Sequence, residues 1–167
     1  PTMFKTSLCM PADPLPGAPS RLARLVKTVA LRAGENLADA ALAWFRRYLD
    51  CAVEPLVRLY DDYGIALEAH QQNSLLDVGT GYPSVSYYRD NQGFYLSERY
   101  RSLIAGHVPE TERIASLYFA ESEIRDRFAY YLIVNQVFSV ISRMGHDGLC
   151  DESLLLRELR AHIERYA

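Results

Sequence analysis

The densest group of polar side chains in the sequence is the run Glu-Ala-His-Gln-Gln-Asn at positions 68–73. It continues a segment in which apolar and polar residues alternate, as they do along a β-strand, so Glu68, His70 and Gln72 are predicted to line one face. The imidazole of His70 could bind a carboxylate or move a proton, and Glu68 could orient that ring. The amide oxygens of Gln72 and Asn73 could bind magnesium or a nucleotide. The alternative interpretation is a solvated edge strand without a ligand.

A second polar pair, Arg89-Asp90, closes a predicted hairpin of two strands joined by a glycine-rich turn. If the strands pair, Asp90 returns beside Gln72 and Asn73. A carboxylate next to two amide oxygens has the chemistry of a magnesium site that bridges phosphates. The alternative is that Arg89 and Asp90 form an ordinary surface pair that contributes little to stability.

Other polar positions are assigned structural roles. His146 and Cys150 are four residues apart, but no second ligand pair accompanies them, so a plain turn is expected there. Asn135 lies in an apolar run, where its amide is expected to brace the core. His107 and His162 are expected at the surface.

The order of the elements predicted around the polar run, helices followed by strands and then helices, indicates an α+β fold with helices flanking a small antiparallel β-sheet. Residues 1–19 are interpreted as a cut N-terminal end followed by a proline-rich linker. Residues 20–167 then form one domain. Its predicted parts are helices over 20–63, a β-hairpin region over 65–96 and helices over 97–166, the last including segments at 109–118, 122–144 and 152–166.

Local signals set the bounds of the first helices. Ser20 and Asn36 are predicted N-caps, and Gly34 and Gly64 are predicted to end the two helices. Pro55 lies inside the second helical pattern, where it removes a backbone donor and clashes with the preceding turn. A kink or break is therefore expected near Cys51.

Composition excludes several classes of protein. The 167 residues carry a formal charge of -3, which leaves no basic excess for nucleic acid. Mean hydropathy is -0.12, and no apolar run is long enough to span a membrane, so no membrane association is expected. Cys9, Cys51 and Cys150 are far apart and form no Cys-x-x-Cys pair, which favours a reduced, cytoplasmic setting.

The strings YGIALEAHQQNSLL at 63–76, YRD at 88–90 and YYLIVN at 130–135 resemble the C-terminal part of the NRPS-independent siderophore synthetases, the aerobactin-synthetase-like enzymes. The resemblance extends from about Pro14 to the end of the chain. It implies an enzyme that uses ATP and Mg²⁺ to adenylate citrate or a related di- or tricarboxylate. The acyl group then passes to a polyamine, a hydroxamate-bearing amine or an amino alcohol, and AMP and pyrophosphate are released.

The resemblance also implies roles for individual residues. His70 and Glu68 would be catalytic and contact the carboxylate and the acyl-adenylate. The residues that would face the nucleotide are Gln72, Asn73, Arg89 and Asp90, with Gln72 and Asp90 also holding the magnesium ion. Members of the family often form homodimers, and the oligomeric state of this chain is left open.

The sequence departs from the family in extent, because complete members are several times longer and bind the ATP phosphates with residues upstream. The Lys-Thr-Ser string at 5–7 is too close to Glu68 to be that part and lacks phosphate-loop spacing, so it is assigned no chemistry. The chain alone is therefore expected to be inactive. Two alternatives remain, a non-catalytic binding module of the same fold and a ferric-siderophore reductase. The reductases hold an iron–sulfur centre with a C-terminal cysteine cluster, and only Cys150 lies near this end.

Overall fold

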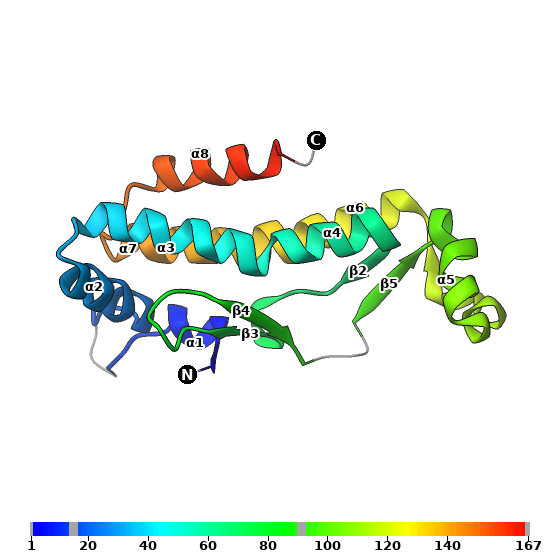
Figure 1. Cartoon of the computed structure of the whole chain (residues 1–167), viewed down its shortest axis with the longest axis horizontal. Helices are drawn as coiled ribbons and strands as arrows, with labels where there is room; N and C mark the ends of the chain where they lie inside the picture. Colours follow the sequence, from blue (N-terminus) through cyan, green and yellow to red (C-terminus); the bar gives the residue numbers. More distant parts are fainter. Residues whose placement is uncertain (1, 14–16, 90–92, 166–167) are drawn as a thin grey trace.

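The computed structural model of the chain describes residues 2–13, 17–89 and 93–165, and it shows an elongated molecule built on a rod of helices (Figure 1). Helices α3 and α4 run almost end to end, α6 and α7 lie along them, and α8 packs on the side away from the strands. In chain order the elements are β1 (Thr2–Phe4), α1 (Lys5–Cys9), α2 (Arg21–Ala33), α3 (Leu37–Ala52), α4 (Glu54–Tyr63), β2 (Ile65–Leu67), η1 (Gln71–Asn73), β3 (Ser74–Asp77), β4 (Val85–Tyr88), β5 (Phe94–Ser97), η2 (Glu98–Tyr100), α5 (Arg101–His107), η3 (Pro109–Arg113), η4 (Ala115–Leu117), β6 (Tyr118–Phe119), α6 (Glu121–Ala129), η5 (Tyr130–Val137), α7 (Phe138–His146) and α8 (Glu152–Ile163).

The predicted caps of the first helices are confirmed. The Ser20 hydroxyl accepts a hydrogen bond from the backbone N–H of Ala23 at 3.0 Å, and the Asn36 side chain accepts one from Ala38 at 2.8 Å. These bonds satisfy N–H groups that have no partner within the first turn of a helix. Gly34 ends α2 in the left-handed conformation.

The predicted break in the second helix is also confirmed. Helix α3 ends at Ala52, and α4 begins at Glu54 with Pro55 in its first turn, where a missing N–H is tolerated. Gly64 then ends α4 with a φ of 68°. The interrupted rod carries the buried aromatic side chains of the core on one face and delivers the chain to the strands.

The α+β class with helices flanking small sheets is confirmed, but the strands divide between two sheets. The first has the order β1-β3-β4 and contains the predicted hairpin, in which Ser74 pairs with Tyr88. The second has the order β2-β5-β6, and its β5–β6 pairing is parallel. The polar run at 68–73 therefore lies where the chain passes from one sheet to the other.

Residues 2–9, which the sequence assigns to a cut end before the domain, pack against the elements of that domain. Strand β1 pairs with β3, and α1 places Leu8 in the main core and Lys5 in a site where only 1% of the residue is exposed. The partner strand lies about seventy positions further along the chain, so local sequence signals could not reveal this packing.

The second half is helical, as expected, except over positions 108–119. Instead of a helix at 109–118, the chain forms the short turns η3 and η4 and then β6. Ile114 is exposed whereas Tyr118 is buried in β6, so the apolar residues of this segment do not form one buried helical face. The segment predicted at 122–144 is one helical run, α6–η5–α7, whose middle part η5 is a π-helix.

The main core joins α3 to the first sheet. Trp44, Phe45 and Tyr48 are buried on one face of α3, and the rings of Trp44 and Tyr48 stack with centroids 5.8 Å apart. The indole N–H of Trp44 donates to the carbonyl of Gly81 in the β3–β4 turn at 3.2 Å. This packing fixes the hairpin relative to the rod.

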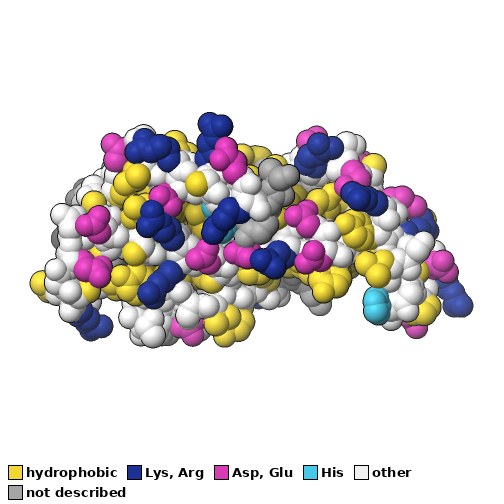
Figure 2. Space-filling view, turned by 45° about the horizontal axis from the view of Figure 1, so that its top comes forward, with side chains coloured by type: hydrophobic (Ala, Val, Ile, Leu, Met, Phe, Trp, Pro, Cys, Tyr) yellow, Lys and Arg dark blue, Asp and Glu magenta, His cyan; other side chains and the backbone are white. Residues whose placement is uncertain are grey.

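Basic and acidic side chains are interspersed over the face drawn in Figure 2, and neither sign gathers into a large patch there. Within the described ranges, none of the helices has both the length and the apolar character needed to cross a bilayer.

Candidate functional site

The polar run is not the extended segment that its alternation predicts. Strand β2 stops at Leu67, and two tight turns follow, in which Ala69 N–H donates to Leu67 O at 2.8 Å and His70 N–H donates to Glu68 O at 2.9 Å. Residues 71–73 then form η1. The prediction that Glu68, His70 and Gln72 share one strand face is therefore wrong, because the backbone turns between the first two residues.

His70 and Gln72 instead line a cavity of about 600 Å³ between η1 and the π-helix η5. The described residues around it are His70, Gln71, Gln72, Tyr130, Tyr131, Asn135 and Ser139. The ring of His70 lies against that of Tyr131, with centroids 5.5 Å apart and planes inclined by 59°. The wall thus combines an imidazole, three amides, two phenols and a hydroxyl, groups that can bind a polar anion of citrate size.

The π-helix shapes one wall of this cavity. In a π-helix the helical turn is widened by one residue, a feature frequent at functional sites. Asn135, expected to brace the core, lies at the cavity wall and holds η1, since its side-chain oxygen accepts from Gln71 N–H at 3.5 Å. Its carbonyl accepts from the Gln71 amide at 3.3 Å and from the Ser139 hydroxyl at 2.7 Å. Asn135 is therefore both a brace and a lining residue.

Gln136 and Lys5 hold the turn before His70 through a series of hydrogen bonds. The buried Gln136 amide donates to the carbonyl of Ala69, and its oxygen accepts from Lys5 Nζ at 2.6 Å and from Tyr48 OH at 3.4 Å. Lys5 Nζ also donates to Ser86 Oγ at 3.0 Å. A chain of hydrogen bonds thus runs from α1 to the backbone beside His70.

The sequence predicts no chemistry for Lys5, yet its buried amine is bonded to the glutamine that holds this turn. Its ammonium group lies 5.7 Å from the ring centroid of Tyr48 and 5.3 Å from that of Tyr88. Burial lowers the pKa of Lys5 from 10.5 to about 7, against a smaller opposite effect from Cys51. No local signal could have found this, because its hydrogen-bond partners are 81 and 131 positions away.

Asn73 and Arg89 are brought together as the hairpin prediction requires. The carbonyl of Asn73 accepts from Arg89 N–H at 3.2 Å, and the Asn73 amide nitrogen lies 3.5 Å from His70 Nε2. Asn73 is buried and Arg89 is exposed. Asp90, the predicted partner of Gln72 in a magnesium site, lies outside the described residues.

Glu68 faces the second sheet. Its carboxylate accepts a hydrogen bond from Tyr95 OH, and its backbone N–H donates to Gly93 O at 2.7 Å. The guanidinium of Arg127 lies 5.1 Å from the centre of the Tyr95 ring. Glu68 is not among the described residues that line the cavity with His70.

Comparisons with known proteins show that this chain is similar in sequence to proteins of siderophore synthesis. The sequence model of the family described as ferric iron reductase FhuF-like transporter matches residues 42–167. The spermidine-citrate ligase of Bacillus anthracis is 39% identical over 155 residues, which cover 92% of this chain and 26% of the ligase. The rhizobactin siderophore biosynthesis protein RhbC of Rhizobium meliloti is 36% identical over 151 residues, covering 90% of this chain and 26% of that protein.

A solved structure has the same fold as this chain over nearly its whole length. The aerobactin synthetase IucA from a hypervirulent pathotype of Klebsiella pneumoniae superposes with a TM-score of 0.90 at 32% identity, over 98% of this chain and 29% of that one. The ATP-bound structure of IucA matches with the same values. The chain spans about a quarter of the length of the curated relatives it matches.

Proposed function

The chain belongs to the FhuF-like family and its relatives are NRPS-independent siderophore synthetases, and from this we propose that it forms part of the active site of an ATP-dependent, AMP-forming ligase. The ligase would adenylate a carboxylate of citrate or a related di- or tricarboxylate, with pyrophosphate as the leaving group. An amine or alcohol would then attack the acyl carbon and release AMP. The relatives include a spermidine-citrate ligase and an aerobactin synthetase with bound ATP, which supports these substrates.

The observation that carries the proposal is the cavity between η1 and η5. Its volume of about 600 Å³ is in the range of small-molecule sites. The His70 imidazole can donate a hydrogen bond to a carboxylate, and the amides of Gln72 and Asn135 can orient the remaining oxygens. Attack by a carboxylate on a phosphate joins two anions, so positioning and neutralisation of charge matter more than a covalent nucleophile.

The described lining of this cavity carries no cation for the ATP phosphates. None of the seven described lining residues is Lys or Arg, although triphosphate binding requires cations. Gln72 and Asn73 fit a magnesium ion only as neutral oxygen donors, and the carboxylate proposed to join them, Asp90, is outside the described residues. A bound magnesium ion would neutralise phosphate charge; the residues of this chain would bind and orient the acid.

A second candidate function has one observation in its favour, the family description, which names a ferric iron reductase. Cys9, Cys51 and Cys150 are free cysteines, and none lies in a Cys-x-x-Cys pair. Iron–sulfur centres are usually held by four cysteines, so the thiols of this chain do not fit the reductase chemistry. Bound iron with visible absorbance in the purified protein would favour the reductase and contradict the ligase.

The test uses the natural protein that carries this sequence, with magnesium ATP and a panel of di- and tricarboxylic acids. We expect acid-dependent release of AMP and pyrophosphate, and a loss of at least about 100-fold in His70→Ala. His107→Ala, at an exposed histidine remote from the cavity, is the matched control. Normal turnover by folded His70→Ala would contradict the proposed role of the cavity. A folded protein that releases no AMP with any acid would leave the non-catalytic binding module as the better account.

A further inference from the structure

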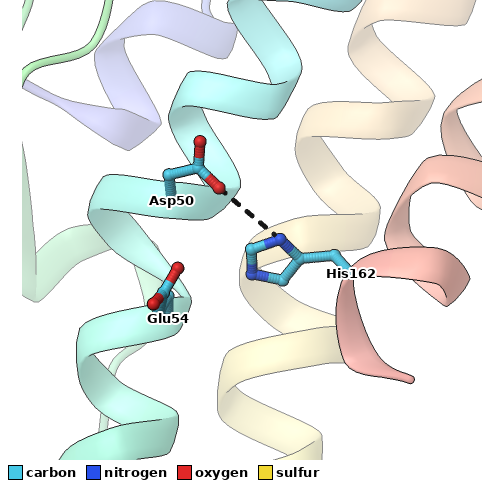
Figure 3. A group of neighbouring side chains, drawn as sticks. All are labelled: Asp50, Glu54 and His162. Carbon is cyan, nitrogen blue, oxygen red and sulfur yellow. Dashed lines mark ion pairs between the residues drawn. The ribbon is translucent and has the colours of Figure 1, made fainter. Parts of the chain in front are cut away.

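Three side chains with metal-binding atoms meet where the last turn of α8 reaches the junction of α3 and α4 (Figure 3). Asp50 lies in the last turn of α3, Glu54 begins α4, and His162 lies in the last turn of α8. One ligand atom from each of them lies within 4.8 Å of the other two. His162, expected at the surface, is in fact only 4% exposed.

The distances between these ligand atoms are close to those expected of a metal site before the ion binds. His162 Nδ1 lies 3.7 Å from the carboxylate of Asp50. Bonds of about 2.0 to 2.2 Å in tetrahedral geometry place ligand atoms roughly 3.4 Å apart. The separations in the cluster, all within 4.8 Å, must therefore shorten by at most about 1.4 Å. Asp50 can make that movement because its side chain is 56% exposed, whereas the packing of α8 holds the His162 ring in place.

A cation already occupies this position in the form of a side chain. Arg165 donates a hydrogen bond to His162 Nδ1, and its guanidinium lies 3.6 Å from Asp50. Because a guanidinium only donates, Nδ1 must present a lone pair toward the cluster, which is the form of imidazole that binds a metal.

A metal ion that binds His162 and Asp50 must displace the guanidinium of Arg165 from them. Glu54 is paired with Arg58 at 2.8 Å, and Glu158 is paired with Arg46 at 2.7 Å. Arg165 is exposed and borders a cavity of about 260 Å³ beside His162, so its side chain has room to move away. An ion that replaces the Arg165 guanidinium would then meet the His162 imidazole and the Asp50 carboxylate, together with the Glu54 carboxylate, which Arg58 also pairs.

We propose that Asp50, Glu54 and His162 form a binding site for a divalent transition metal of the zinc class, which fastens α8 to the α3–α4 junction. One nitrogen and two oxygen donors suit Zn²⁺, with water in the fourth position. Mg²⁺ and Ca²⁺ prefer sites made of oxygen alone and should bind much more weakly. The site is separate from the cavity at His70 and does not depend on the proposed function.

The test measures the melting temperature and the calorimetric affinity of the 167-residue chain with Zn²⁺ and, in parallel, with Mg²⁺. At a zinc concentration about 100 times Kd, we expect the melting temperature to rise by roughly 5 to 10 °C, and Mg²⁺ at the same concentration to have no effect. Asp50→Asn and His162→Gln should each lower zinc affinity at least about tenfold. Arg165→Gln should raise that affinity, because it removes the competing cation.

His146→Gln is the matched control. His146 and Cys9 border a different cavity, which offers an alternative position for zinc, and the substitution tests whether zinc binds there instead. It should leave the zinc response unchanged. Asp50→Asn replaces an exposed side chain, so it keeps the test decisive if His162→Gln fails to fold. The proposal is overturned if wild type shows no zinc-dependent shift. It is also overturned if Asp50→Asn keeps the full shift or if Arg165→Gln weakens binding.

Discussion

Replacing Lys5 by Met should change how the stability of the chain depends on pH. Lys5 is buried under the turn that precedes His70, with the hydroxyls of Ser86 and Tyr48 and the amide of Gln136 around it. Methionine has a similar length and carries no charge, so the substitution removes the titrating amine with little change of volume.

The magnitude follows from the lowered pKa. A fall from 10.5 in the unfolded chain to about 7 in the folded one corresponds to about 4 to 5 kcal/mol against the charged form. Between these two values the unfolded state binds more protons, so the free energy of unfolding rises with pH. Integrated from pH 7 to pH 9, the gain from this one group is about 2 kcal/mol.

The assay is urea denaturation of wild type and Lys5→Met at several values between pH 6 and pH 9. The range stops there because burial raises the pKa of the Cys9 and Cys51 thiols to about 11, so their ionisation in the unfolded chain opposes the effect above pH 9. Lys27→Met, at an exposed lysine, is the control and should keep the wild-type slope. Equal slopes for wild type and Lys5→Met would refute the reasoning, because they would mean that the folded chain keeps this amine charged.

Two further predictions concern stability and are checked by the same denaturation. Gly64→Ala should cost more than Gly34→Ala: both glycines have positive φ, for which alanine costs about 1 to 2 kcal/mol, but only at Gly64 would the new Cβ lie 2.5 Å from the ring of Tyr100. Equal costs would contradict that contact. Asp147→Ala should cost about 3 kcal/mol at pH 7, because Asp147 is 3% exposed and pairs with Arg143. Burial alone would raise the pKa of Asp147, but hydrogen bonds from Arg143 and Ser20 outweigh it and lower the pKa below 3.8. Its contribution is therefore complete above about pH 4 and lost in stronger acid, where the gap between wild type and variant should close.

Features set by neighbouring residues could be predicted from the sequence. The caps at Ser20 and Asn36, the break before Pro55 and the presence of the hairpin all depend on chemistry within a few positions. The burial of Lys5 and His162 could not, because it depends on packing against elements far along the chain. Lysine and histidine are mostly exposed or intermediate in folded proteins, and the expectation that His162 lies at the surface is wrong.

The candidate site shows the same division. His70 and Gln72 were predicted correctly as neighbours of one surface, but for the wrong reason, since a turn and η1 rather than a strand bring them to the cavity. The π-helix that forms the opposite wall could not be predicted, because its first residues form a continuous apolar run that shows no helical period. Asn135 was visible as a polar residue in that run, and only the structure shows that it borders the cavity.

The passage from one sheet to the other explains why amides gather at the polar run. Between Leu67 and Ser74 the backbone leaves one β-ladder before it joins the next, so its N–H and C=O groups need other partners. Gln136 binds the carbonyl of Ala69, and Asn135 and Gln71 bind each other across the same gap.

These amides therefore have a structural task whether or not a ligand binds, and Glu68 has one in its contact with Tyr95. His70 and Gln72 are different, because their side chains line the cavity. The side-chain amides that bind the crossing backbone belong to Gln71 and Gln136 instead. If the proposed function is right, substitutions at His70 and Gln72 should lower turnover with little loss of stability, while Gln136→Ala should lower both. A Gln136→Ala variant that kept wild-type stability would contradict the assignment of the amides to the backbone crossing.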